Sequence, residues 1–410
     1  MVRYIFVDDA VGGEREELQP LIDNLTDSME YLGGEELRIE PVYPSSFGEQ
    51  RRWLREEDPD GVILDLWLDR YAPPTEEEDR KKQDYRALSL AQELRTRATE
   101  GNVGEFPIVL FSYDEKLNYS YNKDDTGHDL FDMKCLKDSL EDFGDTSKKV
   151  ATRLVSLSRG YEQILDARRR KGGDKSAQFY KFLSFESDPG FLDPRLLAYF
   201  EGRETPIPAH EYARFILTQL LESPDHLKHP LEISGPLIPE DILAARLGVD
   251  IEESDEWNRV LEGIPEEAKY KGPFNEGWDR WWMHYVEKWW ESLSSNGLPL
   301  RRARAEKRVE ILKEALDITG LTPATPLLEE YSSEFWTVCQ GSASSSAKDP
   351  LDPIDGFTLD RKNKQPWQDE LYISEERAIE GIHFQKGYQI DPLEKELLEE
   401  LKQSQRDSDG

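Results

Sequence analysis

The segment from Gly61 to Leu68, GVILDLWL, is apolar except for Asp65. A near-continuous apolar run of this length is typical of a parallel β-strand that is buried on both faces of a sheet. Parallel strands need long crossover connections, which are usually helices. Four other short apolar runs surround this one and alternate with stretches of helical spacing: Tyr4 to Val7, Leu37 to Tyr43, Pro107 to Ser112, and Leu130 to Lys134. The order predicts an α/β fold with a doubly wound, five-stranded parallel sheet.

Polar side chains stand at the carboxyl ends of these predicted strands. Asp8 and Asp9 follow the first strand, Asp65 ends the third, Ser112 ends the fourth and Lys134 ends the fifth. Ligands of open α/β sheets bind at this edge. One such residue would be unremarkable in any α/β domain. Five of them, each at the end of a predicted strand, indicate a functional site.

Three carboxylates at one point repel one another unless a cation lies between them. Mg²⁺ prefers oxygen ligands and would relieve this repulsion, and it would also neutralise phosphoryl oxygens. A lysine adds a second positive charge and a serine hydroxyl adds a hydrogen bond. The free carboxylate of Asp65 could then attack phosphorus in line and form an acyl phosphate.

These residues, within the motifs YIFVDD, DGVILD, PIVLFS and GHDLFDMK, resemble the receiver domain of two-component response regulators over residues 1 to about 140. The resemblance implies a flavodoxin-like fold and Mg²⁺ as cofactor. It implies that Asp8, Asp9, Asp65 and the main-chain carbonyl of Trp67 bind the metal, and that Asp65 is the phosphoacceptor. It also implies that Ser112 and Phe131 form the conformational switch and that Lys134 contacts the phosphoryl group.

Three features depart from the family pattern. Cys135 follows the lysine where the family usually has proline, the loop after Asp65 is long, and residues 114–126 form a poor helix by pattern. These departures put the output surface of the family in doubt, but they leave the acidic residues intact.

The composition indicates a protein of the cytoplasm. The chain has 410 residues, two cysteines and a formal net charge of −33. The N-terminus lacks a signal-peptide pattern, and two cysteines are too few for a disulfide framework. A charge of −33 disfavours nucleic-acid phosphates and anionic membranes as partners, so we expect protein partners.

The sequence pattern divides the chain into four segments. We expect a receiver-like domain over 1–145, a connecting helix and basic linker over 146–175, a mainly helical domain over 176–340, and a low-complexity connector with a C-terminal amphipathic helix over 341–410. The region after residue 176 resembles no family that we can name.

Two basic runs could oppose the overall acidity, although a solvated helix face or a linker is the more ordinary interpretation. They are Arg168 to Lys171 and the group Arg301, Arg302, Arg304, Lys307 and Arg308. The stretch PEDILAARLGV, residues 239–249, hints at a helix-turn-helix. A recognition helix over Asp250 to Trp257 would face DNA with five carboxylates, so we expect no DNA binding.

A tryptophan-rich segment, WDRWWMHYVEKWW, is expected to place most of its tryptophans on one helical stripe. An aromatic core seam is the preferred interpretation, and a partner-binding surface is the alternative. The members are Trp278, Trp281, Trp282, Trp289 and Trp290.

The sequence therefore predicts a signalling protein that is not an enzyme beyond its own phosphoacceptor chemistry. A histidine kinase or phosphotransfer protein would phosphorylate it, and the C-terminal region would contact a protein partner. Three alternatives stay open. They are a phosphate-sink receiver without output, a pseudo-receiver scaffold that is not phosphorylated, and an enzyme located in residues 176–340. No sequence motif supports the enzyme.

Overall fold

The structure is a computed structural model. It describes residues 1–11, 18–70, 83–113, 129–140, 142–169, 175–192, 194–201, 207–221, 237–295, 297–340, 349–360, 370–381 and 389–408. The long loop after Asp65, the segment 114–126, the linker 170–174 and most of the connector 341–355 lie outside these ranges. None of the described helices has the length and apolar character that a membrane span requires.

The chain forms two compact units, and each is described by itself. Among the described residues, unit 1 holds Met1–Thr218 and Lys271–Trp278, and unit 2 holds most of the remainder up to residue 408. The boundaries of these two units differ from the boundaries of the four segments expected from the sequence.

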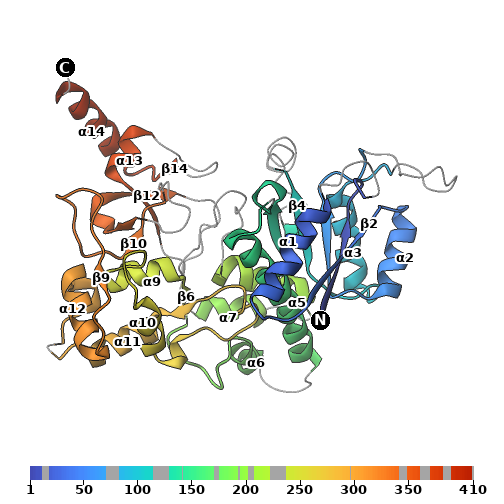
Figure 1. The fold of residues 1–410 in the computed structure, drawn as a ribbon, viewed down its shortest axis with the longest axis horizontal. Coiled ribbons are helices and arrows are strands. Elements are labelled where there is room, and N and C mark those ends of the chain that lie inside the picture. The colour runs from blue at the N-terminus through green and yellow to red at the C-terminus, as the bar shows by residue number, and fades with distance from the viewer. Residues whose placement is uncertain are drawn as a thin grey trace. The chain divides into compact units, whose positions relative to one another are not determined.

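Unit 1 contains the predicted sheet (Figure 1). Its five strands run parallel in the order β2-β1-β3-β4-β5. The strands are β1 (Val2–Val7), β2 (Leu37–Val42), β3 (Gly61–Asp65), β4 (Ile108–Ser112) and β5 (Met133–Leu136). Every residue of β3 and β4 is buried, as the apolar runs predict for central strands covered on both faces. This is a receiver-like α/β fold.

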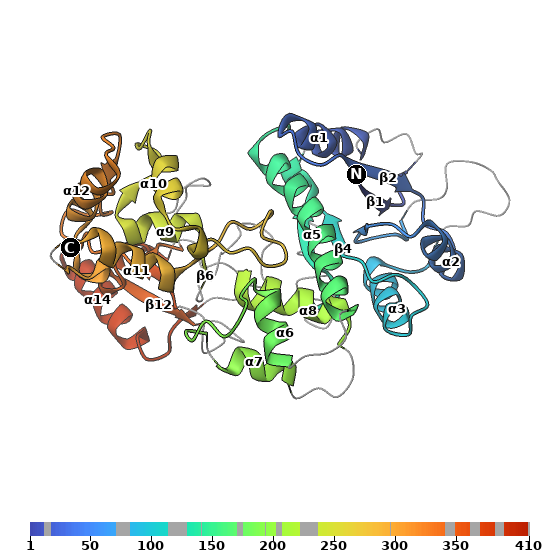
Figure 2. The same cartoon turned by 90° about the horizontal axis from the view of Figure 1, so that it is seen from below.

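Helices cover both faces of the sheet (Figure 2). They are α1 (Leu18–Tyr31), α2 (Phe47–Glu57), α3 (Ala87–Thr99) and α5 (Asp145–Arg169). Leu54 of α2 and Leu90 of α3 pack with Val62 and Leu64 on one face. On the opposite face, the Tyr4 hydroxyl donates a 2.7 Å hydrogen bond to the Leu154 carbonyl of α5.

Gly61 at the start of β3 makes room for the ring of Tyr4. A Cβ atom at this position would lie 2.1 Å from Tyr4 Cε1, so any other residue would displace the ring. The sequence GVILD therefore begins with the one residue type that lets the neighbouring strand place a tyrosine there.

Unit 1 continues beyond the sheet into short helices: α6 (Lys175–Phe182), α7 (Pro194–Glu201), α8 (Ala209–Phe215) and a π-helical turn (Ile216–Leu221), whose last residues belong to unit 2. Glu105 connects them to the sheet, because its carboxylate accepts hydrogen bonds from Arg168 Nη1 at 2.6 Å and from the amide of Ala209. The segment Lys271–Trp278 also packs on α5, where Phe274 covers Gly160 and the Gly277 amide donates to Ser156 Oγ.

Unit 2 is built from helices and small antiparallel sheets. Its helices are α9 (Glu240–Leu247), α10 (Trp257–Gly263), α11 (Met283–Leu293), α12 (Ala305–Leu316), α13 (Glu375–Glu380) and α14 (Lys395–Ser408), with short 3-10 turns at Glu266–Ala268, Leu300–Arg302 and Pro353–Asp355. Its strands pair as β6 (Leu237–Ile238) with β8 (Trp281–Trp282), β7 (Val249–Asp250) with β9 (Thr322–Pro323), β10 (Thr337–Val338) with β11 (Pro350–Leu351), and β12 (Gly356–Asp360) with both β13 (Leu371–Ser374) and β14 (Gln389–Ile390).

The structure does not contain the helix-turn-helix at which residues 239–249 hint. Helix α9 ends at Leu247, and Gly248 follows with a φ of 70° as a left-handed cap. Val249 and Asp250 then form β7, and the next helix begins only at Trp257. The segment proposed as a recognition helix is thus a strand end and a turn.

The tryptophans are core residues, which confirms the preferred interpretation, although the single stripe is wrong. Trp281 and Trp282 form strand β8 before α11 begins at Met283. All five side chains are at most 7% exposed. Only Trp289 and Trp290 of the five belong to α11.

The second basic run is partly internal, so a solvated helix face does not describe it. Arg308 is fully buried, and its Nη1 donates to the carbonyls of Ala245, Arg246 and Phe335. Arg301 donates to the Glu334 carbonyl at 2.6 Å and to Asp352 Oδ1 at 2.7 Å. These two arginines hold neighbouring loops of unit 2.

Candidate phosphoacceptor site

Strand β1 carries the first two acids to the carboxyl edge of the sheet. The Asp8 amide continues the pairing with β2 by donating to the Val42 carbonyl at 3.1 Å. Asp8 Oδ1 accepts a 2.8 Å hydrogen bond from the Ala10 amide, and Asp9 Oδ2 accepts one of 2.6 Å from the Arg70 amide. Both side chains are held by the backbone of the loops that surround them.

Asp65 is the last residue of β3 and is fully buried. Its Cα pairs with Phe111 in β4, so Ser112 lies one residue further along the neighbouring strand. Asp65 Oδ2 accepts a 3.0 Å hydrogen bond from the Trp67 amide. This contact places the predicted metal-binding backbone of Trp67 in the loop directly after Asp65.

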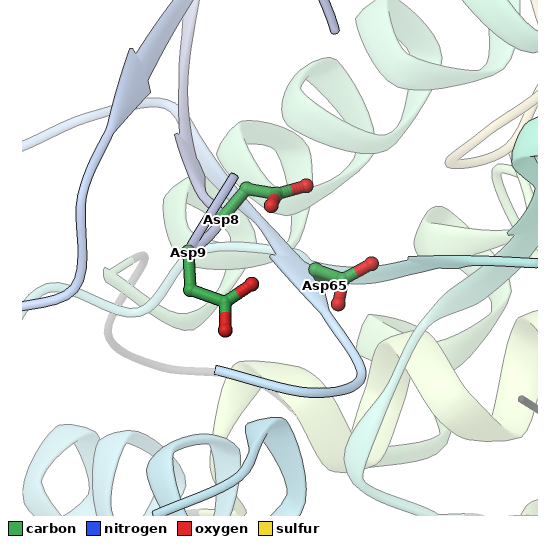
Figure 3. A group of neighbouring side chains, drawn as sticks. All are labelled: Asp8, Asp9 and Asp65. Atoms are coloured by element: carbon green, nitrogen blue, oxygen red, sulfur yellow. The ribbon is translucent and has the colours of Figure 1, made fainter. Parts of the chain in front are cut away.

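The three carboxylates converge, as Figure 3 shows. One oxygen from each of Asp8, Asp9 and Asp65 lies within 4.8 Å of the others. None of the three residues is more than 3% exposed. Buried carboxylates at this separation repel one another strongly, because little water screens them.

A lysine partly compensates this charge. Lys137 Nζ lies 2.6 Å from Asp8 Oδ2 and 2.6 Å from Asp65 Oδ1. Burial alone would lower the pKa of Lys137, but the charges of Asp65 and Asp8 outweigh it and raise that pKa above its usual value. The ammonium group is therefore charged at neutral pH. Three carboxylates and one ammonium leave two formal negative charges in the site.

The prediction of Lys134 as the lysine of this site is wrong. Strand β5 spans Met133–Leu136, whereas the sequence pattern placed it over Leu130 to Lys134. Lys134 lies inside the strand opposite Leu110, and Leu136 pairs with Ser112. Lys137 is consequently the residue that follows the carboxyl end of β5, and it is the lysine that contacts the acids.

The position of β5 is fixed by a buried polar group at the opposite edge of the sheet. Asp132 accepts hydrogen bonds from Arg95 Nη2 at 2.6 Å, from the Tyr161 hydroxyl at 2.8 Å and from the Ile108 amide at 2.8 Å. These contacts join α3, α5 and β4 to the residue that precedes β5. They hold the strand start at Met133.

The two predicted switch residues are both buried. Among the described residues, Ser112 Oγ has no hydrogen-bond partner, which is uncommon for a buried hydroxyl. Phe131 is 8% exposed and packs in the cluster on the α2–α3 face of the sheet. The geometry leaves the Ser112 hydroxyl free to accept a new partner, while the switch role of Phe131 stays a prediction.

The donor set fits a small divalent cation. It offers carboxylate oxygens from Asp8, Asp9 and Asp65, it is buried, and it carries the residual negative charge that such an ion would neutralise. Six-coordinate Mg²⁺ would take these oxygens together with backbone or water oxygens.

Comparisons with known proteins give only distant similarities. No protein-family model and no curated protein matches the sequence. Two similar solved structures are a mutant of RitR and a protein described as one of a novel family of redox sensors in the streptococci that evolved from two-component response regulators. Identities are 13% and 12%, and TM-scores are 0.28 and 0.27. The alignments cover 57% and 58% of this chain and 95% and 96% of those chains. We build no argument on similarities this low.

Proposed function

We propose that this chain is a receiver-like signalling protein that accepts a phosphoryl group on Asp65 with the help of Mg²⁺. The observation that carries the proposal is the contact of one lysine with two of three converging, buried carboxylates. A purely structural polar cluster has no need for a residual charge of this kind, because unpaired buried charge is costly.

The proposed reaction is an in-line transfer. A carboxylate oxygen of Asp65 forms a bond to phosphorus while the bond from phosphorus to the donor's nitrogen breaks, and the electron pair stays with that nitrogen. A bound Mg²⁺, held by Asp8, Asp9 and Asp65, would supply charge neutralisation to the phosphoryl oxygens. Lys137 would hydrogen-bond a phosphoryl oxygen from the position it now holds between Asp8 and Asp65.

Ser112 has a defined part in this proposal. Its hydroxyl is buried beside the end of β3 and finds no partner in the part of the chain that the structure describes, so a phosphoryl oxygen on Asp65 would give it an acceptor. Movement of this hydroxyl toward the phosphoryl group, with repacking of Phe131, would be the switch that the resemblance implies. The donor would be a histidine kinase or a phosphotransfer protein in the cytoplasm, and the output would be a protein contact and not DNA binding.

A pseudo-receiver is the second candidate, and one observation favours it. Lys137 already contacts both Asp8 and Asp65, so the site is partly neutralised by the chain itself. In that case the domain would be a binding scaffold that takes up no phosphoryl group.

Labelling with a small-molecule phosphodonor separates the two candidates. We expect the wild-type protein to gain one phosphoryl group in Mg²⁺, seen by intact-mass spectrometry, and to gain none in EDTA. Asp65→Asn should abolish the label, because the amide is a far weaker nucleophile. Asp69→Asn is the matched control and should label normally, since Asp69 lies outside the group of three converging acids. Undiminished labelling of Asp65→Asn would refute the assignment, and an unlabelled wild type would favour the scaffold.

A further inference from the structure

A polar cavity of unit 1 lies between α2 and α3, away from the acidic site. It has a volume of about 260 Å³ and is lined by Arg51, Arg52, Arg55, Arg97 and Asn102. Arg55 is in the last turn of α2, before β3, and Asn102 lies between α3 and β4. In a parallel sheet the helices run back against the strands, so this cavity is at the amino edge, opposite Asp65.

Four guanidinium groups gather here in a chain whose net charge is −33. Two carboxylates contact part of the group. Glu93 pairs with Arg51 at 3.3 Å and with Arg97 at 2.7 Å, and Glu100 pairs with Arg97 at 2.7 Å. Four positive and two negative charges leave two positive charges at the cavity.

Arg52 and Arg55 supply the uncompensated charge. Both side chains are exposed, and within the described part of the chain neither has a carboxylate in salt-bridge distance. They are three residues apart on α2, and positions with this spacing lie on the same side of a helix. Their guanidinium donors are therefore available to one ligand at the same time.

We propose that this cavity binds a diphosphate group. Arginine matches phosphate oxygens with paired N–H donors, and two arginines on the same side of α2 can each engage a different phosphoryl group of one diphosphate. The volume lies just below the range of about 300–1,000 Å³ that is usual for sites of drug-sized ligands, which suits a compact anion better than a whole nucleotide. Asn102 adds a neutral polar side chain to the same lining. Complementary charge, adjacent donors and size together define the ligand class.

The test is isothermal titration calorimetry of the full chain with pyrophosphate, in EDTA and at low salt. We expect saturable binding of one anion, weakened by added NaCl because the attraction is electrostatic. The double variant Arg52→Gln/Arg55→Gln should weaken binding by about tenfold or more, as expected for the loss of charge-assisted hydrogen bonds. The control is Arg38→Gln/Arg169→Gln, which removes two exposed arginines of unit 1 outside the cavity and should leave binding unchanged.

Further arms identify the source of the anion and exclude the acidic site. Orthophosphate should bind about tenfold more weakly than pyrophosphate, since it can use fewer donors. If ADP binds more tightly than pyrophosphate, the natural ligand is a nucleoside diphosphate. If ADP binds equally well or more weakly, the natural ligand is free diphosphate. Asp65→Asn should not change the affinity. The proposal fails if pyrophosphate does not saturate, if the control variant loses as much affinity as the cavity variant, if orthophosphate binds equally well, or if Asp65→Asn abolishes binding.

Discussion

At the scale of single residues, the lysine of the acidic site shows what a sequence can and cannot reveal. Asp8, Asp9, Asp65 and Ser112 could be located because each ends an apolar run that is unmistakable in the sequence. The fifth run is short and is interrupted by Asp132 and two lysines, so its end was ambiguous. The register was decided by contacts of Asp132 with Arg95 and Tyr161, which are distant in sequence.

Lys137 gives a prediction that separates it from Lys134. Replacing Lys137 by Gln removes the positive charge between Asp8 and Asp65, so in EDTA we expect a loss of about 3 kcal/mol in the free energy of unfolding. Mg²⁺ should restore much of this loss, because an ion at about 100 times its Kd adds about 2.7 kcal/mol. Urea unfolding with and without Mg²⁺ measures both effects.

The matched control is Lys134→Gln. Lys134 lies within β5 opposite Leu110, away from the contacts that Lys137 makes. We expect this variant to lose less free energy of unfolding than Lys137→Gln. Mg²⁺ should stabilise it only as much as it stabilises the wild type. If the two variants respond to Mg²⁺ alike, the assignment of Lys137 to the site is wrong.

At the scale of elements, the sheet was the predictable part of the fold. Buried parallel strands are apolar throughout, so β1, β3 and β4 are clear in the sequence. The two-residue strands of unit 2 have no such pattern, because they are too short to show a period. The sequence around Trp281 illustrates this, since a strand there leads directly into α11, and Trp281 enters the same core as Trp289 and Trp290 of that helix.

Helix α8 gives a prediction about pH. His210 lies in its first turn, and its pKa is lowered to about 3 by burial, with further contributions from Arg95, Arg214 and Arg168. Glu211 Oε1, 3.7 Å from His210 Nε2, opposes this effect only weakly. The folded pKa is below the usual value near 6.5, so the unfolded state binds the proton first as the pH falls. The free energy of unfolding therefore decreases as the pH falls from about 6.5 towards 3. His210 contributes up to about 1.4 kcal/mol per pH unit to this decrease.

Hydrogen exchange of the α8 amides between pH 4 and 7 measures this dependence. His210→Gln should lose protection less steeply than the wild type as the pH falls. His284→Gln, a change in unit 2, is the control and should leave the pH dependence of α8 as it is in the wild type. Equal slopes for His210→Gln and the wild type would show that folding does not lower the pKa of His210.

At the scale of the whole molecule, the output of the proposed switch is the main question. The alternative of the tryptophan-rich segment as a contact surface is excluded by burial, since its five side chains belong to cores. The other surface that we expected to make contacts is the C-terminal helix, and α14 does expose apolar side chains. Leu397 is 50% exposed, and Leu393, just before the helix, is 91% exposed.

Beryllofluoride with Mg²⁺, as a phosphoryl mimic, tests whether the switch reaches beyond the sheet. We expect hydrogen exchange to change in residues 114–126, at α5 and α8, and in at least one segment of unit 2, because α5 connects the receiver-like sheet to the later helices of unit 1. The Asp65→Asn protein with the same additions is the control and should show no change. Changes limited to the residues of the acidic site would favour the phosphate-sink alternative.

The segment Lys271–Trp278 has a consequence for how the protein is made. This segment packs on α5 through Phe274 at Gly160 and through Gly277 at Ser156, yet unit 2 supplies the chain before and after it. During translation, the sheet can assemble long before residue 271 leaves the ribosome, but that face of α5 stays uncovered until then. The first unit is thus completed only after part of the second has been synthesised, and a protein truncated after α8 would leave Ser156 and Gly160 of α5 uncovered.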